Sequence, residues 1–359
     1  YIKEEFFMNK ITQLRQMMAK QQIEALLIST QANVYYVSGF YAEAGVATIL
    51  LTQKDAYLMS DGRFMTEAKE ATNGFEVVRW KDDMFQDLGK LIDTLRIQTV
   101  FVDDDSISYA QASTLMANTK AILKPAPKMI EQMRSIKTKE ELEIIQKACQ
   151  IVDDAFEEIL KYIRPGMSEA QVRNELEFQM RKRGAENCSF ETIIASGARG
   201  ALPHGVASEK IIEKGDMVTM DLGALYHHYC SDITRTIAIG QPNEELIKIY
   251  KIVKDTQAIM AQHLKAGIVS HDLEKIGRDY IEAHGYDLIH GPGHSFGLEI
   301  HEAPFISSKS DAVFEENVVV TLEPGIYVPG LGGVRIEDDF LVTKDGCIQL
   351  THANKDLII

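Results

Sequence analysis

The sequence lacks several patterns that mark whole classes of protein. It has no run of eighteen consecutive apolar residues, so no segment is typical of a membrane-spanning helix. It has no low-complexity tract, and its hydrophobic share of 45% and charged share of 25% are those of a globular chain. Basic residues do not cluster with aromatic residues, and the net charge is −15. This composition argues against partners such as nucleic acids and anionic membranes.

Cysteine is also scarce. The chain has only four cysteines, which lie far apart and include no C-x-x-C pair: Cys149, Cys188, Cys230 and Cys347. This spacing argues against a disulfide framework and against a zinc knuckle. The first residues lack the charged, apolar and small-residue order of a secretory signal. We therefore expect a cytoplasmic protein with reduced thiols.

The length of 359 residues exceeds what one ordinary core supports, so two domains are expected. The first third of the chain alternates short β-branched segments with helix-like segments, which indicates an α/β domain. Strands are predicted over 23–30, 46–52, 56–61, 75–80 and 99–105, and helices over 63–71 and 84–95. Pro125 and Pro127 interrupt the pattern. We place the boundary there, with one domain over 1–125 and the other over 126–359.

The second domain combines helices with two β-hairpins, which predicts an α+β architecture. Thr138 with Glu141, and Ser168 with Gln171, have the spacing of a capping box at a helix start. Helices are predicted over 139–163, 168–184, 243–265 and 270–284. The predicted hairpins join 216–226 to 230–239 and 317–328 to 332–343.

Carboxylates interrupt the apolar strands of both hairpins. They are Asp221, Asp232, Glu323 and Glu337, two on each hairpin. An ionised carboxylate is costly to bury unless a cation or hydrogen-bond donors balance its charge. Arg235 and Arg335 are the only basic residues in these four strand segments, so the carboxylates outnumber them. Two divalent cations would balance all four carboxylates.

The stretch "HGPGHSFGLEIHEAP", residues 290–304, contains three histidines among glycines and apolar residues. It is either a polar loop with chance histidines or part of a metal or catalytic site. His294, at its centre, can complete the ligand set of the four carboxylates. Four oxygen ligands with one imidazole favour Mn²⁺, Co²⁺, Fe²⁺ or Zn²⁺, and a water shared by two such ions is acidic enough to act as a nucleophile.

Five separated motifs, in order, resemble those of the pita-bread-fold metallopeptidases, specifically the Xaa-Pro aminopeptidase and Xaa-Pro dipeptidase (prolidase) branch. They are "HGV" (204–206), "MDLGALYHHYCSDITRT" (220–236), "HGPGHSFGLEIHEAP" (290–304), "TLEPGIY" (321–327) and "GGVRIEDDFLVT" (332–343). In the first domain, "NVYYVSGF" (33–40) and "YLMSDGRF" (57–64) resemble the creatinase/prolidase N-terminal domain. The resemblance covers nearly the whole chain. It implies an α/β N-terminal domain followed by an α+β pita-bread catalytic domain.

The resemblance implies two divalent metal ions per subunit. Asp232 and Glu337 match the family's bridging ligands, and Asp221 matches a ligand of one metal alone. His294 and Glu323 match the ligands of the other metal. Mn²⁺ is the expected metal, with Co²⁺, Zn²⁺ and Fe²⁺ as alternatives.

The resemblance also assigns roles in catalysis and substrate binding. Glu323 matches the glutamate that moves protons from the bridging water. His204, His290 and His301 match histidines that are not ligands but contact substrate and the developing oxyanion. Arg335 matches an arginine that supports the site and can meet a substrate carboxylate. Catalysis is thus expected to use His204, His301 and Glu323, and substrate binding to use the three histidines and Arg335.

The chain departs from the family at Pro292, where a hydroxyl residue is more common. The proline removes a possible hydrogen bond and stiffens the loop, but every expected ligand is present.

The implied reaction is hydrolysis of the bond before proline, through a metal-bridging hydroxide, in Xaa-Pro dipeptides or at the N-terminus of longer peptides. Small proline-containing peptides are therefore the expected partners, and the family implies a homodimer. The sequence does not separate dipeptidase from aminopeptidase. A metal-free peptide-binding module on the same fold is the alternative. The complete ligand set disfavours both that module and a metal-independent creatinase.

Overall fold

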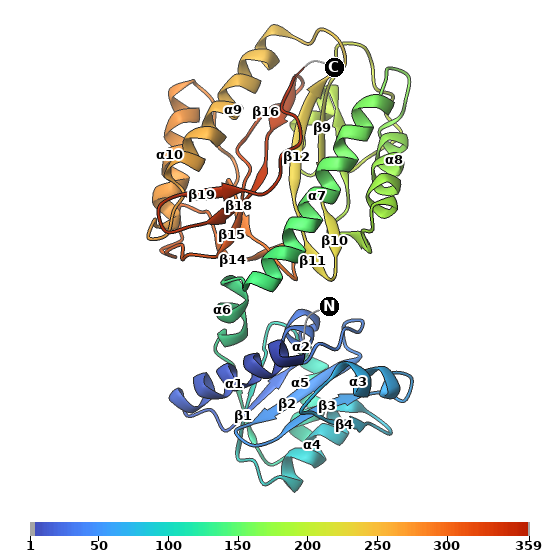
Figure 1. The fold of residues 1–359 in the computed structure, drawn as a ribbon, viewed down its shortest axis with the longest axis vertical. Helices are drawn as coiled ribbons and strands as arrows, with labels where there is room; N and C mark the ends of the chain where they lie inside the picture. The colour runs from blue at the N-terminus through green and yellow to red at the C-terminus, as the bar shows by residue number, and fades with distance from the viewer. Residues whose placement is uncertain (1–3, 358–359) are drawn as a thin grey trace. The chain divides into compact units, whose positions relative to one another are not determined.

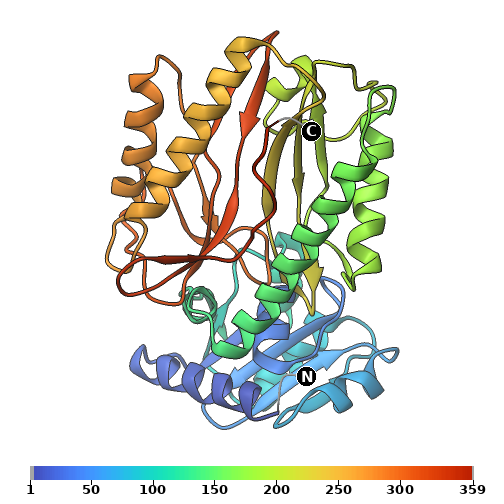
Figure 2. The same ribbon diagram turned by 45° about the horizontal axis from the view of Figure 1, so that its top comes forward.

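In the computed structural model, which describes residues 4–357, the chain forms two compact units that divide after Arg134. The predicted domain boundary near residue 125 coincides with the end of the last strand of the first unit. Figure 1 and Figure 2 show the elements of each unit from two directions. Among residues 4–357, every helix is too short or too polar to span a lipid bilayer.

The first unit is built on one six-stranded sheet. Its strands are β1 (Ala25–Ile28), β2 (Ala47–Thr52), β3 (Ala56–Ser60), β4 (Glu76–Arg79), β5 (Thr99–Val102) and β6 (Ile122–Pro125). Its helices are α1 (Glu4–Lys20), α2 (Gln31–Ser38), α3 (Met65–Ala71), α4 (Met84–Thr94) and α5 (Tyr109–Ala117), and α6 (Met129–Ser135) ends at the division. The strand order is β4-β3-β2-β1-β5-β6, with parallel pairs at both ends and an antiparallel β1-β2-β3 centre. This confirms the predicted α/β character.

The sequence explains why this sheet forms. Each of the five predicted strand segments contains one of the strands β1 to β5, and β1 is buried along its whole length. Helix α4 buries Met84, Phe85, Leu88 and Ile92 in the core beneath the sheet. Asp83 caps this helix by accepting a hydrogen bond from the Gln86 backbone N–H.

Over residues 135–357, the second unit contains four long helices and four sheets. The helices are α7 (Lys139–Tyr162), α8 (Glu169–Lys182), α9 (Glu244–His263) and α10 (Ser270–Ala283), and η1 (Gly197–Ala201) is a 3-10 turn. The strands that precede α9 are β7 (Asn187–Cys188), β8 (Ile193–Ser196), β9 (Met217–Leu222), β10 (Ala224–Tyr226), β11 (Tyr229–Cys230) and β12 (Ile233–Ala238). Those that follow α10 are β13 (His294–Ser295), β14 (Glu302–Phe305), β15 (Val319–Leu322), β16 (Gly325–Val328), β17 (Gly332–Arg335), β18 (Asp338–Val342) and β19 (Cys347–Gln349).

Both predicted capping boxes are present in this unit. Thr138 and Glu141 exchange side-chain and backbone hydrogen bonds at the start of α7, and Ser168 and Gln171 do so at the start of α8. The helices therefore begin where the sequence predicts, and the second unit has the predicted α+β composition.

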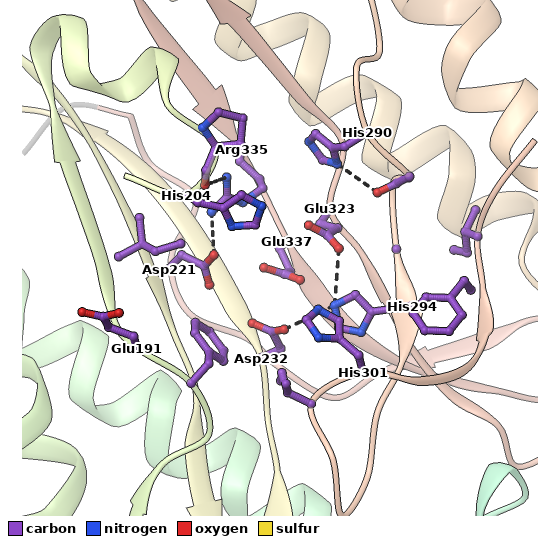
Figure 3. Close-up of a pocket in the computed structure, with 18 of the residues that line it drawn as sticks. Glu191, His204, Asp221, Asp232, His290, His294, His301, Glu323, Arg335 and Glu337 are labelled. Carbon is purple, nitrogen blue, oxygen red and sulfur yellow. Dashed lines mark hydrogen bonds and ion pairs between the residues drawn. The ribbon is translucent and has the colours of Figure 1, made fainter. Parts of the chain in front are cut away.

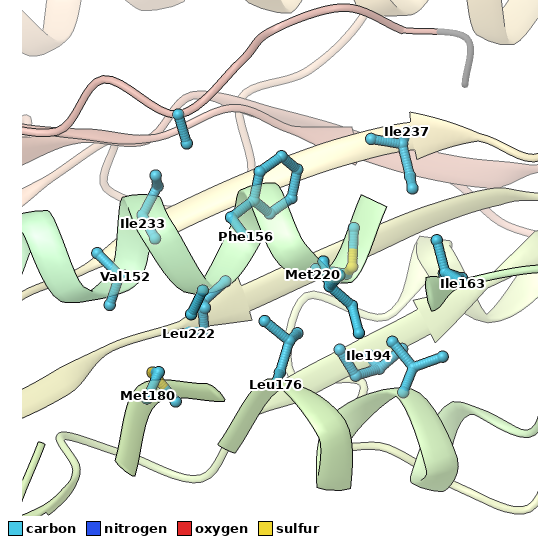
Figure 4. Close-up of a cluster of buried hydrophobic side chains, with 14 of the residues drawn as sticks. Val152, Phe156, Ile163, Leu176, Met180, Ile194, Met220, Leu222, Ile233 and Ile237 are labelled. Atoms are coloured by element: carbon cyan, nitrogen blue, oxygen red, sulfur yellow. The ribbon is translucent and has the colours of Figure 1, made fainter. Parts of the chain in front are cut away.

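Each hairpin lies against its own pair of helices. β9 and β12 pair antiparallel beside β8, and their apolar side chains pack against α7 and α8 (Figure 4). Phe156 and Leu176 of these helices are fully buried among Met220, Leu222 and Ile233. β15 pairs with β18 and packs against α9 and α10 through a separate core that includes Met260 and Leu273. The polar ends of the two hairpins are thereby held on rigid, well-packed supports.

Candidate metal centre and cleft

The four predicted carboxylates come from the two hairpins at matching positions. Asp221 is on β9 and pairs across the ladder with Thr234, and Asp232 directly precedes β12. Glu323 directly follows β15, and Glu337 directly precedes β18. Because the β15–β18 register pairs Leu322 with Asp338, its continuation places Glu323 opposite Glu337. Antiparallel pairing therefore gathers side chains that lie far apart in the sequence.

His294 reaches the same place from β13. Its Nε2 atom lies 3.4 Å from Glu323 Oε1 and 3.7 Å from Asp232 Oδ2 (Figure 3). Gly293 allows this approach, because a Cβ atom at that position would lie 2.1 Å from the Thr321 carbonyl oxygen. The glycine before His294 is therefore required by the close passage of β13 beside β15.

The donor atoms of this cluster suit a cation. One ligand atom from each of Asp232, His294 and Glu337 lies within 4.8 Å of the other two, and all three residues are buried. Among residues 4–357, Asp221 Oδ1 and Asp232 Oδ1 are buried and find no hydrogen-bond partner. A buried carboxylate oxygen without a donor is costly, and a bound cation removes that cost. The residues present therefore fit a divalent metal site.

The pKa values of these groups also indicate a cation site. Burial, followed by the charges of Glu337 and Asp221, raises the pKa of Asp232 well above its ordinary value. Burial, followed by Glu323, does the same to the pKa of Glu337. Burial raises the pKa of Glu323 to about 8 and lowers that of His294 to about 4. Without cations, the cluster retains protons on its carboxyls, and bound cations would replace those protons.

A second set of residues holds the carboxylates in place, and no sequence pattern singled it out. Thr234 donates its hydroxyl to Glu337 at 2.6 Å and accepts the Arg335 Nε–H at 3.1 Å, so it links both hairpins. Gln257 on α9 donates to the carbonyl of Leu322, immediately before Glu323. Neutral threonine and glutamine give no signal by themselves, because only the fold places them behind the acids.

The cluster lies at the base of a cleft of about 740 Å³, a size typical of small-molecule sites. All nine predicted site residues line it: His204, Asp221, Asp232, His290, His294, His301, Glu323, Arg335 and Glu337. His301 approaches His294 with ring centroids 4.4 Å apart. Partial desolvation within the cleft lowers the pKa of both His290 and His301, so each is a neutral imidazole at neutral pH.

Arg335 is almost completely held by the protein. It donates from Nε to Thr234, from Nη1 to Tyr327 Oη at 2.8 Å and to the Pro203 carbonyl, and from Nη2 to Asp221 Oδ2 at 2.5 Å. A guanidinium has five N–H donors, so these four bonds leave one for another partner. The residue primarily orients Asp221.

Tyr327 is a site residue that the sequence left without a role, although it ends the "TLEPGIY" motif. Its hydroxyl lies 3.1 Å from His290 Nε2 and accepts the Arg335 bond, so it joins two of the predicted substrate-binding residues. Pro292 also has a structural task, because its carbonyl accepts the Glu323 backbone N–H at 2.9 Å. The backbone makes this bond, so it does not depend on the proline ring by which the sequence departs from the family.

The α/β unit, the two helix-backed hairpins and the buried carboxylate–histidine cluster together define a metallopeptidase with the pita-bread fold. The sequence matches the profile of metallopeptidase family M24 over residues 143–344, and that of the creatinase/prolidase N-terminal domain over residues 10–136. The chain belongs to metallopeptidase family M24.

Several relatives match over nearly their whole length. An Xaa-Pro dipeptidase of Pyrococcus horikoshii is 42% identical, over 97% of this chain and 98% of the relative. The structure of an Xaa-Pro dipeptidase from Bacillus anthracis superimposes with a TM-score of 0.95 at 43% identity, over 98% of this chain and 100% of the other. An X-Pro aminopeptidase from Thermotoga maritima superimposes with a TM-score of 0.89 at 36% identity, over 97% and 99%.

Proposed function

We propose that this metallopeptidase hydrolyses the peptide bond before proline in Xaa-Pro dipeptides, using two divalent cations. The observation that carries the proposal is the convergence of four carboxylates and His294 at the base of one cleft, beside three further histidines and Arg335. The similarity to two Xaa-Pro dipeptidases at 42% and 43% identity supports the substrate class.

In this proposal Asp221, Asp232, His294, Glu323 and Glu337 hold the cations, of which Mn²⁺ is expected. Bound there, such cations would supply Lewis-acid chemistry, which would make water acidic enough to act as a nucleophile and would polarise the carbonyl of the scissile bond. Such chemistry suits a bond to the proline nitrogen, which has no N–H for a protease to hold.

The chain's own groups then have separate tasks. Glu323 takes and returns protons, a role supported by its place in the cleft lining beside His294. His204 and His301, both exposed in the cleft, stabilise the charge that develops on the carbonyl oxygen. His290 contacts substrate, and Arg335 offers its remaining N–H to the proline carboxylate while it orients Asp221.

Cleavage at the N-terminus of longer Xaa-Pro peptides is the second candidate. The similarity to an X-Pro aminopeptidase over 97% of the chain favours it. Both activities need the same ligands, so only the accepted peptide length separates them. A homodimer remains a prediction. A cytoplasmic location is also a proposal, and it rests on the wide spacing of the four cysteines in the sequence.

The experiment is metal content of the purified protein together with hydrolysis of Gly-Pro and Gly-Pro-Gly after addition of Mn²⁺, Co²⁺ or Zn²⁺. Metal-dependent cleavage of Gly-Pro with little cleavage of the tripeptide is the expected result. Preferred cleavage of Gly-Pro-Gly would establish the aminopeptidase instead. No bound metal and no cleavage with any of the three ions would contradict the proposal and favour a peptide-binding module.

A further inference from the structure

One carboxylate of the cleft takes no part in the metal cluster. Glu191 lies two residues before β8 and lines the same cleft. Within the described part of the second unit its side chain is exposed and forms neither an ion pair nor a hydrogen bond. This distinguishes it from Asp221, which is buried and bound by Arg335.

The backbone directs Glu191 into the cleft. Ile193 pairs with Asp221 in the β8–β9 ladder and lines the cleft. Side chains two residues apart in a strand share a face, so continuing β8 backwards by two residues places Glu191 on the face of Ile193. The intervening Thr192 is fully buried, as expected for the opposite face. Figure 3 shows Glu191 on the Asp221 side of the cleft, across from His290 and His294.

An apolar surface lies beside this carboxylate. Phe190 and Ile193 both line the cleft. The Phe190 ring lies so close to the backbone between β9 and β10 that a Cβ atom at Gly223 would be 2.8 Å from its Cε1 atom. A substrate side chain that extends from the residue before the scissile bond toward Glu191 would therefore pass over the apolar atoms of Phe190 and Ile193 before it reached the Glu191 carboxylate.

The charges of the cleft leave Glu191 without an internal partner. Two divalent cations would balance Asp221, Asp232, Glu323 and Glu337. Arg335, the only lysine or arginine among the described residues that line the cleft, is held by Asp221. The α-ammonium of a dipeptide is bonded to the carbon next to the scissile carbonyl, so it stays beside the buried cluster, whereas the Glu191 side chain is exposed. A long cationic side chain can reach the Glu191 carboxylate while the scissile carbonyl lies over the cluster, and its methylene groups then lie on the apolar surface.

We propose that Glu191 is a specificity-determining residue that favours lysine or arginine as the residue before proline. This inference rests on the proposed Xaa-Pro hydrolysis and deepens it. An exposed ion pair is modest in strength, so the expected preference is about two- to fivefold in kcat/KM.

The test compares Lys-Pro with Met-Pro, whose side chains are both long and unbranched but differ in charge. The metal-loaded enzyme and the variants Glu191→Gln and Glu191→Lys are assayed with both dipeptides and with Glu-Pro. Glu191→Gln should lower the Lys-Pro to Met-Pro ratio of kcat/KM by about two- to fivefold. Glu191→Lys should lower it further and raise the Glu-Pro to Met-Pro ratio. Added salt should reduce the preference of the unmodified enzyme, because exposed charges are screened.

Glu209→Gln is the matched control, since Glu209 is an exposed glutamate outside the cleft lining. It should leave both ratios unchanged. Ratios that stay constant in the Glu191 variants would overturn the inference. An equal loss of kcat/KM on all three dipeptides would also overturn it, because Glu191 would then contact the α-ammonium or have a purely structural role. If the unmodified enzyme cleaves none of the dipeptides with any of the three metals, the proposed function fails, and this inference fails with it.

Discussion

The three histidines of the 290–304 stretch have different surroundings, which predict different consequences for their removal. His294 is buried, with Nε2 among carboxylate oxygens, whereas His301 is exposed in the cleft. His294→Ala should therefore lose metal and activity together, on the order of 100-fold or more in kcat. Metal analysis and kinetics on the same preparation check this. Full turnover with unchanged metal content would remove His294 from the ligand set.

His301→Ala should instead retain its metal and lose rate. An imidazole that stabilises a developing oxyanion contributes about 100-fold or more to kcat, and its removal leaves the ligands in place. The measurement is kcat and KM at saturating metal, with metal content as the internal control. Unchanged kinetics would exclude a catalytic role for His301.

The hydroxyl of Tyr327 gives a further prediction at this scale. Tyr327→Phe removes the group that joins His290 to Arg335, leaving a guanidinium N–H unpaired in a buried place. We expect a loss of about 1–3 kcal/mol in the free energy of unfolding and a lower kcat/KM. Denaturant unfolding and kinetics measure both. Tyr109→Phe is the control, because that side chain is 86% exposed, and an equal effect there would contradict the argument.

At the scale of single residues, the sequence predicted charged site groups better than neutral ones. Asp221 and Glu337 stood out because an ionised carboxylate in an apolar strand is costly to bury without a balancing cation or donor. Thr234 and Gln257 did not, because their side chains are ordinary in a strand or helix and act only through contacts across the fold. Glu191 was missed for a related reason, since an exposed acid in a loop is ordinary until the cleft is known.

Among the elements, the predicted helices carry strong local signals, but α5 was not predicted although it also begins at a capping box, formed by Ser108 and Gln111. Helices α7 and α8 begin at capping boxes that the sequence displays. Helix α2 was not predicted, because its sequence, "QANVYYVS", is rich in β-branched and aromatic residues and is almost entirely buried. Strand β6 was hidden by Pro125, which the structure tolerates at the last position of an edge strand.

The passage of β13 beside β15 supports a prediction at the scale of elements. Gly293→Ala would place a Cβ atom 2.1 Å from the Thr321 carbonyl oxygen, so the two strands must separate. We expect a loss of about 1–3 kcal/mol in the free energy of unfolding, together with weaker metal binding because His294 moves. Urea unfolding and metal titration check this.

Gly346→Ala is the matched control for that variant. Nothing lies within 4 Å of a Cβ atom at Gly346, so the added methyl group meets open space. Its stability and metal affinity should stay unchanged. If both variants behave alike, the close passage of the strands is not what fixes His294.

At the scale of the whole molecule, metal binding, protonation and stability are coupled through the cluster. Burial raises the pKa of Glu323 to about 8, and the pKa values of Asp232 and Glu337 are also raised. The unfolded carboxyls are ionised above about pH 5, so the metal-free folded state binds more protons than the unfolded state. Raising the pH through the folded pKa values therefore removes stability. His294 does not oppose this above about pH 7.5, because its imidazole is then almost entirely neutral in both states.

This coupling predicts how the melting temperature responds to pH. The metal-free protein should lose stability between about pH 6.5 and pH 8.5, while the metal-loaded protein should change little, because bound cations keep the carboxylates ionised. The difference in Tm between the two forms should therefore widen with pH, as scanning calorimetry in matched buffers can measure. Glu323→Gln removes one titrating proton and should flatten the metal-free profile. A Tm difference that is constant across this range would mean that the cluster holds no such protons and that cations bind without displacing them. The same would follow if Glu323→Gln left the dependence of the metal-free Tm on pH unchanged.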